Sequence, residues 1–208
     1  MNGDDTRERL LRAAQCLFAE GGEEATSLRA ITREAEANVA AVHYHFGGRD
    51  GLLREVLNRH IEPINVRRLE ILDNAIASTA EPPLAVLIEA FVRPDLETLA
   101  QLRETEPQIA RFIGRAYSQP SAAVAAAAAE QFAGTANRFL QLFAARLPGL
   151  SEAELATRID LVVTIITGLF ARARPSGDSP PLGVEELDKQ VALLVSFVAG
   201  ALAAPPAK

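Results

Sequence analysis

Glycine and proline recur at intervals along this chain, and the stretches between them carry apolar residues at helical spacing. In the segment that begins near Asp5, for example, Leu10, Ala14 and Leu17 fall on one face of a helix. The alternation of apolar and polar residues that would indicate strands is nearly absent. The sequence therefore predicts an all-α fold.

The starts of several helices are marked by residues that cap free backbone N–H groups. Capping boxes pair a Ser, Thr or Asp with a Glu three residues later, and single Asn or Thr side chains also cap. The residues expected to open helices are Asp5 with Glu8, Thr26, Asn38, and Ser151 with Glu154.

Prolines and one polar stretch are expected to interrupt the helices. Pro63 predicts a bend or a new helix start, and Pro94 predicts a kink or a break, because proline lacks the N–H that a helix interior needs. Pro107 and Pro120 fit the first turns of two further helices. The segment 175–183 is rich in Pro, Ser and Gly and predicts a loop.

Composition narrows the classes of protein. Of 208 residues, 49% are apolar, which excludes a mainly disordered chain, and the lone Cys16 excludes a disulfide scaffold. The longest apolar stretch, 191–204, is too short to span a membrane, and no signal peptide is recognisable, so we expect a cytoplasmic protein with no membrane partner. No Gly-rich phosphate loop, G-x-S-x-G motif or metal-ligand cluster is present, so we expect no enzyme, catalytic residue, metal or cofactor.

The first 46 residues predict three short helices, with a tight linker at 36–38 between the second and the third. Two short helices joined by such a turn, with a preceding helix that closes a small core, form a helix-turn-helix. Spacing alone is a weak signal, because short helices are common near the N-terminus of helical bundles.

The detailed sequence of this region is more specific. It contains A-A-x-x-L-F-A-E-G-G, then A-T-S-L-R-A-I, then Y-H-F-G before a basic residue and Leu-Leu. Together these motifs resemble the DNA-binding domain of the TetR family of transcriptional repressors over Thr6 to Leu57, about a quarter of the chain. The resemblance implies a helix-turn-helix DNA-binding domain at 1–50 and a helical ligand-binding and dimerisation domain at 51–208. It also implies a homodimeric repressor that binds a palindromic operator in double-stranded DNA and is released by a small-molecule effector.

The resemblance places the DNA contacts on the second and third helices and on the residue that opens the fourth. Glu36 stands where the family commonly has Gly, so we expect a turn of another type, and Val39 replaces a frequent Lys. Residues 1–60 hold eight Arg against ten Asp and Glu, within a chain of net charge −6, so electrostatic steering toward DNA should be weak. The candidate DNA-binding residues are Thr26, Ser27, Arg29, Asn38, Val39, Ala40, Ala41, His43, Tyr44, His45 and Arg49.

Within this set, the small residues Ala40 and Ala41 would let the third helix approach the major groove. Tyr44, His45 and Arg49 are expected to contact phosphates. A metal site at His43 and His45 is disfavoured, because residues two apart do not share a helix face and no Cys lies near.

The remaining three quarters of the chain predict a dimer and a cavity. The last two long helices are apolar almost all round in their second halves, which predicts a four-helix interface between two copies, although two internal helices of a monomer remain the alternative. The candidate interface residues are Ile159, Val162, Val163, Ile166, Phe170, Leu187, Val191, Leu194, Val195 and Val198. The candidate walls of a cavity for a largely apolar ligand are Phe91, Phe112, Tyr117, Phe132, Phe139 and Phe143. A helical ligand-binding or adaptor dimer without DNA binding is the alternative function.

Overall fold

A computed structural model describes residues 3–174 and 183–206, and all regular structure within these ranges is helical. This confirms the predicted all-α fold. The helices are, in chain order, α1 (Gly3–Gly21), α2 (Leu28–Glu34), α3 (Val39–Phe46), α4 (Arg49–Ser78), α5 (Leu84–Thr105), α6 (Pro107–Ser118), α7 (Ala122–Arg146), α8 (Glu152–Ala171) and α9 (Val184–Leu202).

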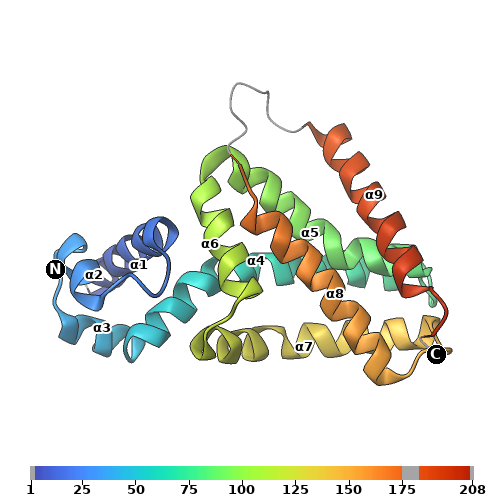
Figure 1. The fold of residues 1–208 in the computed structure, drawn as a ribbon, viewed down its shortest axis with the longest axis horizontal. Coiled ribbons are helices and arrows are strands. Elements are labelled where there is room, and N and C mark those ends of the chain that lie inside the picture. The colour runs from blue at the N-terminus through green and yellow to red at the C-terminus, as the bar shows by residue number, and fades with distance from the viewer. Residues whose placement is uncertain (1–2, 175–182, 207–208) are drawn as a thin grey trace.

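The helices form two groups that α4 joins (Figure 1). Near the N-terminus, α1, α2 and α3 pack on one another, and α1 and α3 also pack on α4. The buried side chains here include those of Phe18, Ile31, Val42 and Leu53. At the other end, α5 and α7 pack on α4, while α6 packs on α8 and α5 packs on α9. The long helix α4 therefore places the small N-terminal group relative to the larger body.

Two prolines lie inside helices that the sequence predicts to be interrupted there. α4 is one helix across Pro63, so the expected new start is wrong, and α5 runs through Pro94 without a break. A proline in a helix interior costs about 3 kcal/mol locally. Burial on either side of it offsets that cost: Ile61 and Ile64 flank Pro63, and both are at most 5% exposed.

The observed caps confirm some predicted helix starts and correct others. The Asn38 and Ser151 side chains cap α3 and α8, as expected. The capping box at Asp5 is wrong, because α1 already begins at Gly3 and Asp5 lies in its first turn. The expectation that Thr26 caps α2 is also wrong, because the hydroxyl of Ser27 accepts a hydrogen bond from the backbone N–H of Ala30.

The remaining boundaries follow the predicted prolines closely. Pro107 is the first residue of α6, whereas Pro120 precedes the Ser121 cap of α7 and lies just outside that helix. Most of the loop predicted at 175–183 lies outside the described residues. No helix in the described ranges is long and apolar enough to cross a membrane.

Candidate DNA-contacting surface and ligand cavity

The turn between α2 and α3 keeps a left-handed residue although no glycine is present. Glu36 has φ 48°, the region that glycine normally occupies. The N–H of Ala37 donates to the carbonyl of Thr32 at 2.8 Å, and the N–H of Glu36 donates to that of Arg33 at 3.2 Å. These two bonds form a Schellman motif, which ends a helix with a left-handed residue. The expectation of another turn type is therefore wrong, because this pair of hydrogen bonds holds Glu36 in the strained conformation.

The start of α3 is fixed by its cap. Asn38 Oδ1 accepts the N–H of Ala41 at 2.8 Å, and Val42 packs inward with no exposed surface. The opposite face of α3 is open: Tyr44 is 85% exposed, and Ala40 is exposed as well. The cap and the buried Val42 together decide which side chains α3 presents outward.

Most of the predicted DNA-binding set lies at this end of the molecule with outward side chains. Val39 and His43 are exposed on α3, while Ala41 and His45 are half-buried. Ser27 and Arg29 are exposed at the start of α2. The structure thus brings together nine of the predicted positions on two neighbouring helices and their N-caps: Ser27, Arg29, Asn38, Val39, Ala40, Ala41, His43, Tyr44 and His45.

Two members of the predicted set have side chains that face the protein instead. Thr26 is 7% exposed, and its single hydroxyl hydrogen is shared between the carbonyls of Gly22 at 2.8 Å and Leu17 at 3.1 Å. The Arg49 guanidinium donates to the carbonyls of Glu23 and Thr26, and it lies over the Phe18 ring at 5.7 Å. Both side chains tie the loop after α1 to its neighbours. A phosphate contact by Arg49 would require these bonds to open.

Sequence reasoning missed an arginine beside this surface. A groove between the start of α1 and α3 is lined by Thr6, Arg9, Asn38 and Tyr44 among others. The buried Nε of Arg9 has no hydrogen-bond partner among the described residues, and its terminal nitrogens make only long contacts with Asp5 and Thr6. No local pattern marks Arg9, because its place beside α3 depends on the fold of the whole N-terminal group.

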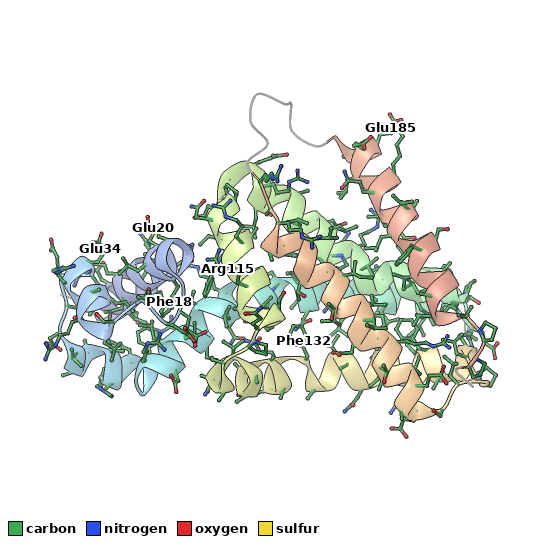
Figure 2. All side chains as sticks on the ribbon, viewed as in Figure 1. Phe18, Glu20, Glu34, Arg115, Phe132 and Glu185 are labelled. Atoms are coloured by element: carbon green, nitrogen blue, oxygen red, sulfur yellow. The ribbon has the colours of Figure 1, made fainter. Side chains whose placement is uncertain are left out.

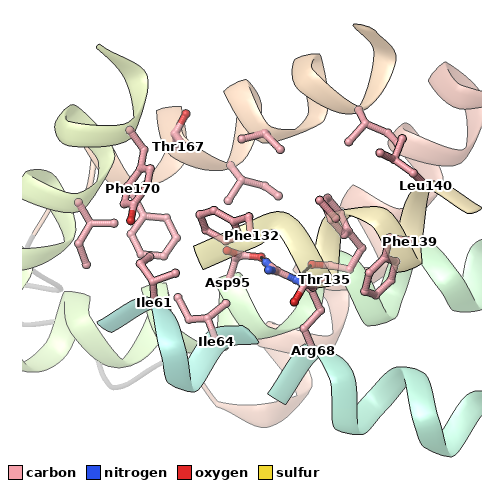
Figure 3. Close-up of a pocket in the computed structure, with 17 residues that line it drawn as sticks. Ile61, Ile64, Arg68, Asp95, Phe132, Thr135, Phe139, Leu140, Thr167 and Phe170 are labelled. Atoms are coloured by element: carbon pink, nitrogen blue, oxygen red, sulfur yellow. Dashed lines mark hydrogen bonds and ion pairs between the residues drawn. The ribbon is translucent and has the colours of Figure 1, made fainter. Parts of the chain in front are cut away.

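The larger group of helices encloses a cavity of about 240 Å³ between α4, α5, α6, α7 and α8. Four of the six aromatic residues predicted for a cavity line it: Phe91, Tyr117, Phe132 and Phe139 (Figure 3). The other two do not. Phe112 stacks on Phe18 of α1 at 5.9 Å, and Phe143 packs behind Phe91 and Phe139.

A buried ion pair in the wall of this cavity was not apparent from the sequence. Arg68 of α4 donates from one terminal nitrogen to Asp95 Oδ2 of α5 at 2.6 Å and from the other to Asn65 Oδ1 at 2.6 Å. Its Nε donates to the Phe91 carbonyl at 2.9 Å, and the guanidinium lies 5.0 Å from the Phe91 ring centre. Burial raises the pKa of Asp95, and the Arg68 charge opposes that rise. A charged pair therefore lines part of the cavity that the sequence predicts for a largely apolar ligand.

The faces of α8 and α9 differ from the predicted interface. Five predicted interface residues are at most 6% exposed and pack inside the chain: Val162, Ile166, Phe170, Val191 and Val198. Of the predicted set, Ile159, Val163, Ile166 and Phe170 line the cavity. The strongly exposed apolar residues are others: Leu161 at 60%, Val184 at 77%, Leu193 at 74% and Phe197 at 60%. Placing the five buried residues on an intersubunit surface is corrected, because an all-round apolar pattern does not say which face turns inward.

The N-terminal group and the cavity are connected through α6. Figure 2 shows Phe18 on α1 and Arg115 on α6, where the two groups of helices meet. Arg115 donates to the Ala19 carbonyl at 3.4 Å, and Phe112 of α6 stacks on Phe18. The same helix contributes Ile113 and Tyr117 to the cavity wall, so one short helix contacts both α1 and the cavity.

Comparisons with known proteins agree with this geometry. Residues 10–56 match the family described as bacterial regulatory proteins, tetR family. Residues 89–201 match the tetracyclin repressor-like C-terminal domain. The probable HTH-type transcriptional regulator YttP of Bacillus subtilis (strain 168) is 33% identical over 57 residues, which is 27% of this chain and 28% of that protein. That match therefore spans little more than a quarter of the relative's length.

Solved structures share the fold along nearly the whole chain. The probable transcriptional regulatory protein RHA5900 is 20% identical with a TM-score of 0.58, covering 96% of this chain and 100% of that one. NalD, the secondary repressor of the MexAB-OprM multidrug efflux pump in Pseudomonas aeruginosa, is 23% identical with a TM-score of 0.54, covering 96% and 98%. PfmR, a TetR family transcriptional regulator from Thermus thermophilus, is 17% identical with a TM-score of 0.54, covering 93% and 97%. With two family matches that together span most of the chain, this protein belongs to the TetR family of bacterial transcriptional regulators.

Proposed function

We propose that this protein is a repressor that binds operator DNA through α3 as a homodimer and is released by a small ligand. The observation that carries the proposal is the outward face of α3, with the small Ala40 and the 85% exposed Tyr44 held in place by the Asn38 cap. Small residues let a helix enter the major groove, and a tyrosine hydroxyl binds phosphate. The division into a DNA-binding part at 1–50 and a body at 51–208 remains part of this proposal, with α4 running across the boundary.

The test of DNA binding is a charge placed on the α3 face. Ala40→Asp adds a carboxylate near the start of α3, where the helix dipole tolerates a negative charge, so the fold should be kept. We expect the variant to lose binding to operator and random DNA alike, measured by fluorescence anisotropy. Ala126→Asp, at an exposed position of α7, is the matched control and should bind like the wild type. Equal DNA binding by Ala40→Asp and the wild type would contradict the placement of α3 in the groove.

The homodimer is proposed on the exposed apolar residues of α8 and α9. Leu161, Leu193 and Phe197 are each at least 60% exposed, and burying them against a second copy would stabilise a dimer. Paired recognition helices would then enter successive major grooves about 34–36 Å apart. Leu193→Glu should give monomers in sedimentation velocity, while Val66→Glu, at an exposed apolar residue of α4, should remain dimeric. A dimer that survives Leu193→Glu would move the interface elsewhere.

Release by a ligand is proposed through α6. A molecule that enters the cavity contacts Ile113 and Tyr117, and the same helix touches α1 through Phe112 and Arg115. A shift of α6 would therefore change the position of the N-terminal helices relative to the body. Such a ligand must bind the released conformation more tightly, and a 100-fold preference is worth about 2.7 kcal/mol per site.

A further inference from the structure

The cavity has one charged region in a mainly apolar wall. Eleven of the residues that line the cavity are Ile, Leu, Val or Phe. Arg68, Asp95 and Thr135 lie together and form what we call the polar region (Figure 3). Building on the proposed ligand release, we infer that the cavity binds an uncharged, mainly apolar molecule carrying one hydroxyl group, which hydrogen-bonds with Asp95 and Thr135.

The first step of the argument is the unused hydrogen-bonding capacity of this region. The Asp95 carboxylate accepts from Arg68 through Oδ2 and from its own backbone N–H, and no other side chain among the described residues donates to it. Because a carboxylate offers about four lone-pair sites, it can accept a further hydrogen bond. Thr135 is 7% exposed and its hydroxyl makes no side-chain hydrogen bond within the described residues, whereas that of Thr167 donates to the Thr164 carbonyl. A ligand hydroxyl can donate to the carboxylate and accept from the threonine, so it satisfies both groups at once.

The second step concerns charge. Arg68 and Asp95 are each at most 8% exposed and together carry no net charge. The two charges of this pair already compensate each other. A ligand carboxylate beside the pair would be repelled by Asp95, and a ligand ammonium would be repelled by Arg68, so either would add an uncompensated charge to a buried site. A neutral hydroxyl avoids that cost. The pair therefore selects against anions and cations alike.

The third step concerns size. A cavity of about 150 Å³ is enough for benzene, and drug-sized ligands occupy pockets of roughly 300–1,000 Å³. At about 240 Å³ this cavity lies between those cases. A single substituted ring or a medium-length alkyl chain fits this volume, with the hydroxyl at the polar region and the hydrocarbon against the Ile and Phe side chains.

Three probes of similar shape test the inference: 4-propylphenol, propylbenzene and 4-propylbenzoate. Their dissociation constants are measured at pH 7 by isothermal titration calorimetry with the wild-type protein. We expect 4-propylphenol to bind at least tenfold more tightly than each of the other two, because one bond goes to a charged group. Binding of propylbenzene or 4-propylbenzoate that equals or exceeds that of the phenol would overturn the inference, and so would the absence of binding by 4-propylphenol.

Variants assign the selectivity to the polar region. Thr135→Val keeps the shape and removes the hydroxyl, so the preference for 4-propylphenol over propylbenzene should fall about fivefold. Thr167→Val is the matched control in the same cavity, and its preference should be that of the wild type. An unchanged preference in Thr135→Val would overturn the role of Thr135. Asp95→Asn tests the role of the carboxylate as acceptor, and circular dichroism shows whether this variant still folds. If it does not fold, the comparison of Thr135→Val with Thr167→Val decides whether the polar region selects the ligand.

Measurements of DNA binding and ligand binding on the same protein distinguish this inference from the proposed function. Operator binding is measured with and without 4-propylphenol. Selective phenol binding with no DNA binding would refute the repressor but support the ligand class. DNA binding with propylbenzene and 4-propylphenol bound equally would support the repressor and overturn the ligand class. Ala136→Phe, which fills the cavity, should abolish phenol binding; unchanged binding would place the phenol elsewhere and overturn the inference.

Discussion

Gly114 lies where the backbone of α6 passes close to that of α8. A Cβ atom added there would lie 2.1 Å from the Ala171 nitrogen and 2.6 Å from the Phe170 carbonyl carbon. Both are backbone atoms, so no side-chain rotation relieves the contact, and the helices must separate by about 1.3 Å to reach ordinary contact at 3.4 Å. Overpacking of this kind costs roughly 1–3 kcal/mol, and the backbone clash places it at the upper end. Alanine's better helix propensity returns up to about 1 kcal/mol. We therefore expect Gly114→Ala to lower the free energy of unfolding by about 2 kcal/mol.

Gly134→Ala is the matched control for this prediction. Gly134 is exposed on α7, and a Cβ there would meet no atom within 4 Å, so only the helix propensity changes. We expect this variant to be more stable than the wild type by about 0.5–1 kcal/mol. Urea denaturation followed by circular dichroism measures both. If Gly114→Ala were as stable as Gly134→Ala, the close α6–α8 contact would be refuted, and with it the wall that Phe170 and α6 give the cavity.

Three further predictions concern single residues. Glu36→Gly should be more stable than Glu36→Ala by about 0.5–1 kcal/mol, because both remove the charge but only glycine relieves the left-handed conformation; equal denaturation midpoints would contradict this. Asn38→Ala should cost about 1 kcal/mol in urea denaturation, because Ala41 loses its cap, and no loss would refute the capping bond. Burial, together with the Arg59 charge, lowers the pKa of His60 to about 4, so the unfolded chain takes up a proton first and stability falls as pH drops from about 6.5 to 4. His60→Leu should remove about 2 kcal/mol of that loss between denaturation curves at pH 7 and pH 4.5, and an unchanged difference between the two pH values would count against it.

Local signals predicted much of the fold. The caps at Asn38 and Ser151, and the glycines after α1 and α3, act within one or two turns of helix, so the sequence contains them directly. Among the predictions from local signals that were wrong, one missed by a single residue and another failed because contacts between distant parts of the chain override the local preference. Ser27 caps α2 one residue from the expected Thr26, whose hydroxyl the fold uses to bind the loop after α1. Pro63 does not end α4, because packing on both sides of it holds the helix together.

The candidate sites depend more heavily on contacts between distant residues. Arg68 and Asp95 are 27 positions apart on different helices, and no local pattern shows that they meet inside a cavity. The inward face of α9 holds Val191 and Val198, while its outward face holds Leu193 and Phe197. Both faces are apolar in sequence, so only the packing of α9 on α5 distinguishes them. Arg49 illustrates the same limit, because its partners lie in a loop more than twenty residues earlier.

Binding to DNA as a function of salt tests the proposed repressor most directly. The wild-type protein is titrated with the DNA fragment that flanks its own coding region and with a shuffled fragment of the same composition, between 50 and 200 mM salt. A repressor that reads bases through α3 should prefer the natural fragment by roughly 10³-fold or more, and its affinity should fall steeply as salt rises. Equal affinity for the two fragments, or no binding to either at 50 mM salt, would contradict the account.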